Sequence, residues 1–411
     1  MLIKTLDIQL LIYLSKLIDE RRYRDFIGAL PECLAWNILR FLTVKELAIV
    51  CQVSSQWCSL ANNNEVWKVK YHESFICLPR YLDEQYRCWK EIYRQAVKLH
   101  FNWTNGYAKR LELCGHKDKV LSLSTYEDLL ATGSCDNTIK VWILSTAQLK
   151  QTLVGHKKSV WCVHLFSHNI VISGSHDTTI RIWNIEYGTI IRILLSHRGP
   201  VWQIACQGEL LLSTSQDMTG KVWRITRCRI LHTLIGHTAS VFAGDLSDTG
   251  SEAVTGSADK TIRIWNCHNG QCNRTIQLSK VDPIVAVSYS SGYIAYAHGS
   301  TVSVIHLTNN DSIFEHSEHK DRIETVQLKI YSNENLHPLL SKKKKTSTDF
   351  QGILMTGARD NYVKYCNLGE SRTVDSLKGE KGGKIYSILF DDRRIMKTSK
   401  NVIVIYDFNT N

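Results

Sequence analysis

Histidines followed by an aspartate 20 to 22 residues later recur through the middle of the chain. The pairs are His116 with Asp136, His156 with Asp177, His197 with Asp217, and His237 with Asp259. An aspartate beside an imidazole can orient a general base, and both side chains can also bind metals. A tryptophan follows each aspartate after six residues, at Trp142, Trp183, Trp223 and Trp265. Because the whole set recurs at the period of a repeat, the sequence favours a structural role for these residues over catalysis or metal binding.

Other motifs that would indicate an enzyme do not occur in the sequence. It contains no nucleotide-binding glycine loop, no G-x-S-x-G and no H-E-x-x-H. The 13 cysteines are scattered and form no C-x-x-C pair, a pattern typical of reduced thiols. We therefore predict a protein that is not an enzyme, with no catalytic residues, no cofactor and no metal, located in the cytoplasm, the nucleus or both.

Composition and charge are those of a globular protein, with 44% hydrophobic and 22% charged residues in 411. The net charge of +11 could indicate a nucleic-acid partner. Apart from the run Lys342 to Lys345, however, the basic residues are dispersed, and we expect no such partner. No apolar run approaches the roughly 18 residues that span a bilayer. The apolar stretch Leu6 to Ile18 is interrupted by polar residues, so we expect neither a signal peptide nor a membrane partner.

The histidines mark an internal repeat with gaps of 40, 41 and 40 residues (116 to 156, 156 to 197, 197 to 237). Two further steps of 41 reach His319, which is followed by Asp360 and Tyr365. Units at about 278–307 and 379–408 have lost the motif but keep alternating segments, which makes seven units. Runs such as Thr179–Trp183 alternate with period two, so one face of each strand can pack on the next unit. Radial stacking of seven small sheets would cover both faces of each.

Over 111–408 the chain resembles the WD-repeat family. This resemblance implies a seven-bladed WD40 β-propeller in which a histidine, a Ser or Thr, an aspartate and a tryptophan form a hydrogen-bonded tetrad in each blade. In the second unit the tetrad would be His156, Ser173, Asp177 and Trp183. The last unit is one strand short, and we expect Lys109 to Leu113 to supply that strand and close the ring.

The segment 30–67 has helical periodicity and precedes the propeller. Leu34, Ile38 and Leu42 recur at four-residue spacing, and three short amphipathic helices are predicted. Pro31 suits the first turn of a helix. Thr43 and Glu46 form a capping-box pattern for the second helix. We therefore predict the fold class α plus all-β, with short helices before an all-β propeller.

The same segment resembles an F-box, the motif that docks a Skp-type adaptor onto a cullin scaffold. The resemblance rests on Leu30-Pro31, Ile38-Leu39, Leu42, the string from Cys51 to Trp57, and Trp67. Arg24 to Ile27 resembles the junction before the F-box in F-box/WD-repeat receptors, and Trp89 to Tyr93 with Asn102-Trp103 resembles their helical linker. The candidates that the resemblance gives for the adaptor contact are Leu30, Pro31, Leu34, Ile38, Leu39, Leu42 and Leu47. The alternative is that they form the core of the bundle, and we expect some of each.

We predict four regions along the chain. They are an N-terminal helical segment (1–27), the F-box (28–70), a helical linker (71–103) and the propeller (104–411) with an insertion loop at 331–350. The first segment either forms a homodimer, as in some receptors, or packs as a plain helix on the F-box. The lysines at 342–345 are either a nuclear-import signal or part of a solvated loop.

Substrate-binding candidates come from two positions that face the central opening in this family, after the first valine and before the turn aspartate of each unit. The candidates are Trp161, His176, Trp202, Phe242, Arg359 and Tyr386. Receptors of this family that read phosphorylated segments carry arginines at such positions, whereas here only Arg359 qualifies. Arg322 and Lys158 stand at nearby positions of their own repeat units. We therefore expect an aromatic anchor, with phosphate at most a secondary contact. Packing between blades is the alternative role.

These resemblances imply a substrate-recognition subunit of an SCF-type ubiquitin ligase. The F-box would bind a Skp-type adaptor and through it a cullin, and the propeller would bind the protein to be ubiquitinated. Two alternatives remain open. One is a WD-repeat scaffold that acts outside a ligase, and the other is a propeller that binds nucleic acid or chromatin.

Overall fold

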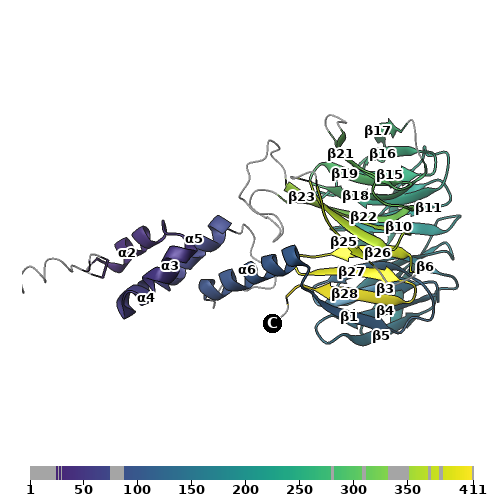
Figure 1. Ribbon diagram of the computed structural model, residues 1–411. Helices are drawn as coiled ribbons and strands as arrows, with labels where there is room; N and C mark the ends of the chain where they lie inside the picture. Colours follow the sequence, from purple (N-terminus) through teal and green to yellow (C-terminus); the bar gives the residue numbers. More distant parts are fainter. Residues whose placement is uncertain are drawn as a thin grey trace, which may run out of the picture. The chain divides into compact units, whose positions relative to one another are not determined.

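The computed structural model describes residues 25, 27, 28, 30–74, 88–278, 282–307, 312–331, 351–368, 372–378 and 383–409 (Figure 1). Contacts divide the chain into two units, Met1–Lys98 and Leu99–Asn411, and the boundary falls inside helix α6 (Trp89–Asn105). The predicted N-terminal segment (apart from residues 25 and 27), most of the insertion loop and the lysines at 342–345 lie outside the described residues. The predicted region boundaries stay predictions.

The first unit is helical. It contains α2 (Glu32–Leu39), α3 (Val44–Val50), α4 (Ser55–Ala61), α5 (Asn64–Ser74) and the first part of α6. Its buried core contains Leu39, Leu47, Leu60 and two valines, Val50 and Val66, with two alanines. The sequence predicted three helices over 30–67; the structure adds α5, which begins inside that range. Pro31 is the N-cap residue of α2, one position before its first turn.

Side-chain caps fix where these short helices begin. The hydroxyl of Thr43 accepts from the amide of Glu46, and the Glu46 carboxylate accepts from the Thr43 amide at 2.7 Å. This confirms the predicted capping box. Ser54 caps α4 by accepting from the amide of Trp57 at 3.2 Å. Each cap satisfies backbone donors that a helix leaves unpaired at its start.

The second unit contains seven four-stranded sheets, as predicted. The first three blades are β2 (Val120–Tyr126) to β5 (Gln148–Val154) with β3 (Leu129–Ser134) and β4 (Thr138–Ile143); β6 (Val160–Ser167), β7 (Ile170–Ser175), β8 (Thr179–Asn184) and β9 (Thr189–Leu195); and β10 (Val201–Gln207), β11 (Leu210–Ser215), β12 (Gly220–Arg224) and β13 (Arg229–Leu234). The short 3₁₀ helix η2 (Ile225–Arg227) connects β12 and β13.

The remaining blades follow the same order. They are β14 (Val241–Leu246), β15 (Glu252–Ser257), β16 (Thr261–Asn266) and β17 (Cys272–Gln277); β18 (Ile284–Ser290), β19 (Tyr293–His298), β20 (Thr301–His306) and β21 (Ser312–His316); β22 (Ile323–Tyr331), β23 (Gln351–Ala358), β24 (Tyr362–Asn367) and β25 (Arg372–Lys378); and β26 (Ile385–Phe390), β27 (Arg394–Ser399) and β28 (Val402–Asp407) with β1 (Lys109–Cys114). The predicted insertion separates β22 from β23.

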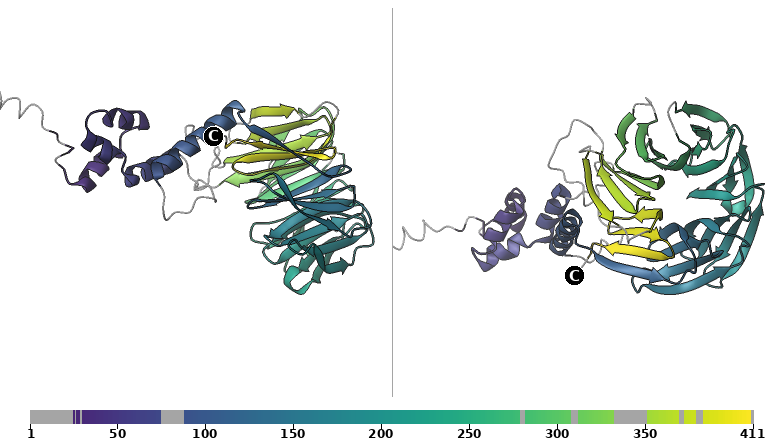
Figure 2. Two further views of the ribbon diagram at one scale, coloured as in Figure 1. Left: turned by 90° about the horizontal axis from the view of Figure 1, so that it is seen from below. Right: turned by 45° about the vertical axis from the view of Figure 1, so that its right-hand side comes forward.

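The ring closes as predicted. Strand β1 pairs antiparallel with β28, from Lys109 opposite Asp407 to Cys114 opposite Val402, and completes the last blade. Figure 2 shows β1, in blue, beside the yellow strands of that blade. Side chains from the first and last blades, among them Leu113, Trp142 and Ile403, share one apolar cluster. The closure therefore combines a complete hydrogen-bonded ladder with apolar burial.

The predicted tetrads are present. In the second blade His156 contacts Asp177 through Nδ1 at 2.8 Å and Ser173 through Nε2 at 2.7 Å, and the Trp183 indole donates to the same Ser173 hydroxyl. Equivalent contacts form around His116, His197 and His237. His319 repeats them with Asp360 and Thr356, although Tyr365 stands where the other blades have tryptophan. The tetrads are structural, because their ring nitrogens are occupied by hydrogen bonds inside the blades.

In three of the tetrads the surroundings favour a neutral imidazole beside a charged carboxylate. Burial lowers the pKa of His156, His237 and His319 below the ordinary 6.5, although the neighbouring aspartate opposes that shift. Burial alone would raise the pKa of Asp177. Hydrogen bonds from His156, Thr179 and the Lys157 amide outweigh burial and hold that pKa well below 3.8.

We predict that the propeller loses stability as the pH falls below 6.5. Because the folded histidines have lowered pKa values, the unfolded chain binds more protons in that range, and each unit of pKa difference contributes about 1.4 kcal/mol. The tetrad aspartates add a further loss below about pH 3.8. Asp245, whose pKa burial raises to about 6, acts in the opposite direction and reduces the net effect. Urea unfolding at pH 7.5, 6.5 and 5.5 measures the change, and a constant midpoint would contradict the prediction.

Candidate partner-binding surfaces

The helical unit exposes apolar side chains that its core does not use. Leu34, Ile38 and Phe41 follow one another at helical spacing along α2 and the turn after it, and Phe41 is 78% exposed. Ile49 on α3 and Val53 after it are also exposed. These five residues are called the exposed apolar set below. Burying such side chains against a partner would be favourable by the hydrophobic effect.

The residues predicted to contact an adaptor divide between the surface and the core. Pro31, Leu34 and Ile38 are exposed, and Leu30 and Leu42 are partly buried against the core. Leu39 and Leu47 are fully buried in it. Their role in adaptor binding stays a prediction. Sequence reasoning missed Phe41, Ile49 and Val53, although Phe41 continues the spacing of Leu34 and Ile38.

Four of the predicted substrate-binding residues form one continuous aromatic group. Trp161, Trp202 and Phe242 lie near the start of β6, β10 and β14, the first strands of three consecutive blades. The ring of Trp202 packs edge to face on those of Trp161 and Phe242, with ring centroids 4.7 Å and 5.7 Å apart. His176 contacts Trp202 at 6.1 Å. All four are partly buried, so they pack on one another and keep some surface for a partner.

The other two candidates do not join this group. Tyr386 lies on β26 of the seventh blade. Arg359 precedes the turn aspartate of the sixth blade and forms an ion pair with Glu324, to which Arg322 is also close at 3.9 Å. An arginine already paired with a carboxylate would have to exchange that partner to bind phosphate. The geometry therefore agrees with the expectation that phosphate is at most a secondary contact, which stays a prediction.

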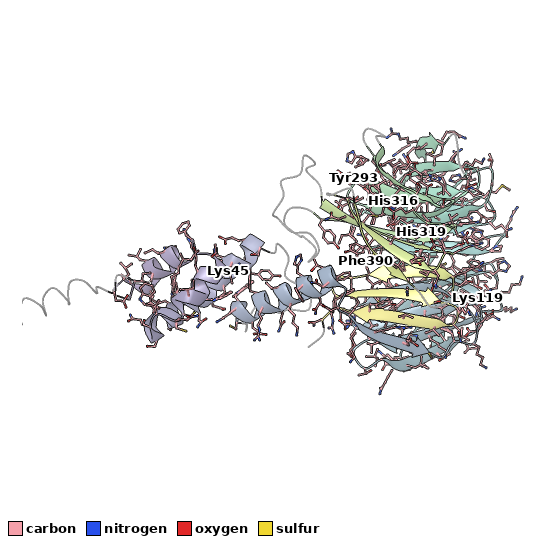
Figure 3. All side chains as sticks on the ribbon, viewed as in Figure 1. Lys45, Lys119, Tyr293, His316, His319 and Phe390 are labelled. Carbon is pink, nitrogen blue, oxygen red and sulfur yellow. The ribbon has the colours of Figure 1, made fainter. Side chains whose placement is uncertain are left out.

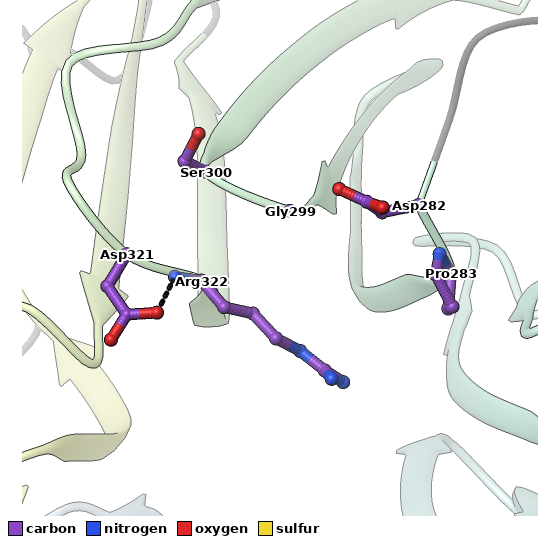
Figure 4. A pocket seen from close by; sticks show the side chains of 6 residues that line it. All are labelled: Asp282, Pro283, Gly299, Ser300, Asp321 and Arg322. Atoms are coloured by element: carbon purple, nitrogen blue, oxygen red, sulfur yellow. Dashed lines mark hydrogen bonds between the residues drawn. The ribbon is translucent and has the colours of Figure 1, made fainter.

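A pocket of about 370 Å³ opens between the fifth and sixth blades. Asp282 and Pro283 line it from the loop before β18, Gly299 and Ser300 from the turn after β19, and Asp321 with Arg322 from the loop before β22 (Figure 4). The Arg322 amide donates to the Asp321 carboxylate at 2.7 Å. Nε of Arg322 is buried without a hydrogen-bond partner among the described residues. The pocket thus offers two carboxylates and one guanidinium to a polar ligand.

Basic residues gather in the loops that enter each blade and in the turns beside the tetrads. The exposed members are Lys117, Lys119, Lys157, Lys158, Arg198, Lys260, Lys320, Lys384 and Lys400. They are called the basic rim below. Exposed acidic residues in the same described loops are Asp118, Asp282, Glu318 and Asp321. Figure 3 labels Lys119 on this rim and the buried tetrad histidine His319. In these described loops and turns, exposed basic residues therefore outnumber exposed acidic residues by nine to four.

Within the described ranges, no group of three or more His, Cys, Asp or Glu side chains is arranged to hold a metal ion. None of the helices in those ranges combines the length and apolar character needed to cross a membrane.

Comparisons with known families identify both parts of the chain. The F-box-like family model matches residues 27–73. The model of the WD domain, G-beta repeat, matches 108–142, 147–184, 188–224 and 228–266. The WD40 β-propeller domain of Doa1 superimposes with a TM-score of 0.61 at 20% identity and covers 74% of this chain and 97% of that one. The chain therefore contains an F-box-like segment followed by WD40 repeats, and its propeller has the WD40 fold.

Similar proteins combine the same two parts. F-box/WD repeat-containing protein 7 of Drosophila melanogaster is 30% identical over 36% of this chain and 12% of its own length. F-box/WD repeat-containing protein sel-10 of Caenorhabditis elegans is 31% identical over 36% of this chain and 32% of its own length. Another relative, from Arthroderma benhamiae, is described as a probable E3 ubiquitin ligase complex SCF subunit, sconB, and is 30% identical over 31% of this chain and 25% of its own length. The matches span a third or less of these relatives.

We predict that replacing Trp161 and Trp202 together by alanine removes the proteins that co-purify with the full chain through its propeller. An aromatic hot spot that becomes desolvated on binding is worth roughly 2–4 kcal/mol. Thermal unfolding is measured alongside, because both rings pack on their neighbours and their removal also lowers stability; the double variant is assayed at a temperature at which it stays folded. Arg359→Gln serves as the comparison and should retain those proteins. Loss of partners in Arg359→Gln but not in the double variant would instead favour a phosphate-reading pocket.

Proposed function

We propose that this chain is the substrate-binding subunit of an SCF-type ubiquitin ligase. Its F-box-like unit binds a Skp-type adaptor and, through it, a cullin, while its propeller holds the protein to be ubiquitinated. The observation that carries this proposal is an F-box-like segment with exposed apolar side chains on the same chain as a closed WD40 propeller. Relatives whose names are F-box/WD repeat protein or SCF subunit support it.

Adaptor binding is assigned to the exposed apolar set. In an interface, a few large apolar side chains that lose contact with water provide most of the binding free energy. Phe41 is the largest member of the set and the most exposed. Thr43, two residues later, caps the next helix, so Phe41 lies in a short turn whose exit is fixed by hydrogen bonds. The backbone at Phe41 therefore loses little conformational freedom when the side chain binds.

The chain itself performs no bond-making step under this proposal. The transfer of ubiquitin belongs to the conjugating enzyme that the ligase recruits, and the receptor raises the local concentration of the substrate and orients it. The partly buried aromatic group and the basic rim are the surfaces offered to the substrate. A cytoplasmic or nuclear location is part of the same proposal and is supported by the scattered cysteines. Dimerisation through residues 1–27 stays a prediction.

The basic rim supports a second candidate, a propeller that binds nucleic acid or another polyanion. In the described loops nine exposed basic residues outnumber four exposed acidic residues. This excess and the net charge of +11 favour the second candidate. Binding to DNA or RNA through lysines releases counterions, so its affinity would fall steeply with salt. Adaptor recruitment would persist at salt concentrations that abolish nucleic-acid binding, because apolar contacts are not screened. The salt dependence of each interaction therefore distinguishes the two functions.

We predict that Ile38→Lys combined with Phe41→Lys abolishes co-precipitation of the adaptor and cullin with the full chain. Each lysine would have to be desolvated opposite an apolar partner surface, which costs several kcal/mol in total. The helical unit should stay folded, because both side chains are exposed.

Tyr187→Lys in the propeller, at a side chain that is also largely exposed, is the matched control and should recover the adaptor normally. Circular dichroism checks that the helices remain. Undiminished adaptor recovery with the folded double variant would contradict the assignment of the F-box-like unit.

A further inference from the structure

The outer strand of the second blade differs from those of its neighbours. In β9 the residues Ile191, Ile193 and Leu195 are exposed by 45%, 45% and 76%. Ile193 lies opposite Arg181 in the ladder between β8 and β9. At the equivalent position of the outer strand, the first, third and fourth blades carry Thr152, Thr233 and Thr275. The fifth, sixth and seventh blades carry Glu315, Ser376 and Glu112 here, so every other blade has a polar residue where the second has isoleucine.

Threonine has a structural reason at this position. The hydroxyl of Thr152 accepts from the ammonium of Lys140 at 3.0 Å, and Thr233 accepts from Lys221 at 3.3 Å. Ile193 cannot accept a hydrogen bond, and Arg181, which lies opposite it, donates to Thr179 instead. The second blade therefore exposes an aliphatic side chain where its neighbours satisfy a lysine. Folding of the blade does not require that exposure.

A groove of about 380 Å³ adjoins β9 on the side of the third blade. Arg192, Ile193 and Leu194 line it from β9, and Thr226, Arg227 and Cys228 line it from η2 and the residue that follows. Leu194 reaches the apolar cluster shared with the third blade. Because side chains alternate along a strand, those of Arg192 and Leu194 lie on one face of β9 and those of Ile193 and Leu195 on the other. Among the described residues, neither Arg192 nor Arg227 forms an ion pair.

β9 is also the last strand of its sheet, whose order is β6-β7-β8-β9. The outer edge of such a strand carries backbone donors and acceptors that pair with no further strand of that sheet, and it is a template for strand addition. A strand added here would place alternate side chains beside Arg192 on one face and beside Ile193 and Leu195 on the other.

We infer that β9 and this groove bind an extended segment of a partner protein in which carboxylate and aliphatic side chains alternate. The carboxylates contact Arg192 and Arg227, and the aliphatic side chains cover Ile193 and Leu195. This site lies apart from the basic rim and does not depend on the function proposed above. The two guanidinium groups identify the charge of the occupant. They also disfavour a second copy of this chain, since full-length antiparallel pairing of two β9 strands would set Arg192 against Arg192.

The test uses the full chain and two labelled nine-residue peptides, one of alternating valine and glutamate and one of alternating valine and lysine. Fluorescence anisotropy should show saturable binding of the glutamate peptide and at least about tenfold weaker binding of the lysine peptide, because only carboxylates pair with arginine. Hydrogen exchange should show that the peptide protects the amides of residues 189–195.

Ile193→Thr with Leu195→Thr restores the residue type of the neighbouring blades at one position and should weaken binding about tenfold, as expected when apolar contact is lost at the edge. Ile235→Thr removes a comparably exposed side chain after β13 and should leave binding unchanged. Equal affinity for the two peptides, or no binding up to millimolar concentration, would overturn the inference. Protection at the rim lysines in place of β9, or unchanged affinity of the folded double variant, would also contradict it. Self-association of the chain that the double variant abolishes would instead identify a second copy as the occupant.

Discussion

A buried imidazole joins two separate parts of the chain in each complete blade. In the second blade, Nδ1 of His156 meets the aspartate of the turn between β7 and β8, and Nε2 meets a hydroxyl on β7. The same aspartate accepts from the backbone amide of Lys157, the residue after the histidine in the loop that leads into β6. Loop and turn are thus held together by bonds whose loss would leave buried polar groups unpaired. The rim residues Lys117, Lys157, Arg198 and Lys320, which directly follow tetrad histidines, take their positions from this constraint.

A ring of blades also requires that its first and last strands meet. The ladder between β1 and β28 meets this requirement. Near the same junction the side-chain amide of Asn102 donates to the backbone carbonyl of Phe408 at 2.8 Å. The ring of Trp103 stacks on that of Phe408, with the ring centroids 3.9 Å apart. Both contacts lie within the second unit, which begins at Leu99. The residues just before the propeller therefore secure its last strand, and a chain that began at β1 would leave Phe408 without them.

The sequence predicted most of the fold because the repeat is written in residue types with fixed spacing. The tetrad of His156, the closure by Lys109 to Leu113 and the capping box of Thr43 depend on local patterns, and all are confirmed. Burial was less predictable. Leu39 and Ile38 are adjacent apolar residues, yet one is fully buried and the other is exposed, because the position of the neighbouring helices decides which side of α2 is covered. Likewise, the gathering of charge on one rim depends on which loops the strands bring together.

Repetition supplies an internal standard for function. Seven copies of one blade face the same folding constraints, so a residue type that recurs satisfies the fold, and a departure from it is a place to look for another role. Loss of the tetrad in the fifth blade coincides with the pocket between Asp282 and Arg322, where the sequence places no histidine in the loop before β18. Replacement of threonine by Ile193 coincides with a groove whose two arginines form no ion pair among the described residues. In both places the blade has given up a hydrogen bond that its neighbours keep, and charged side chains line the hollow that lies there.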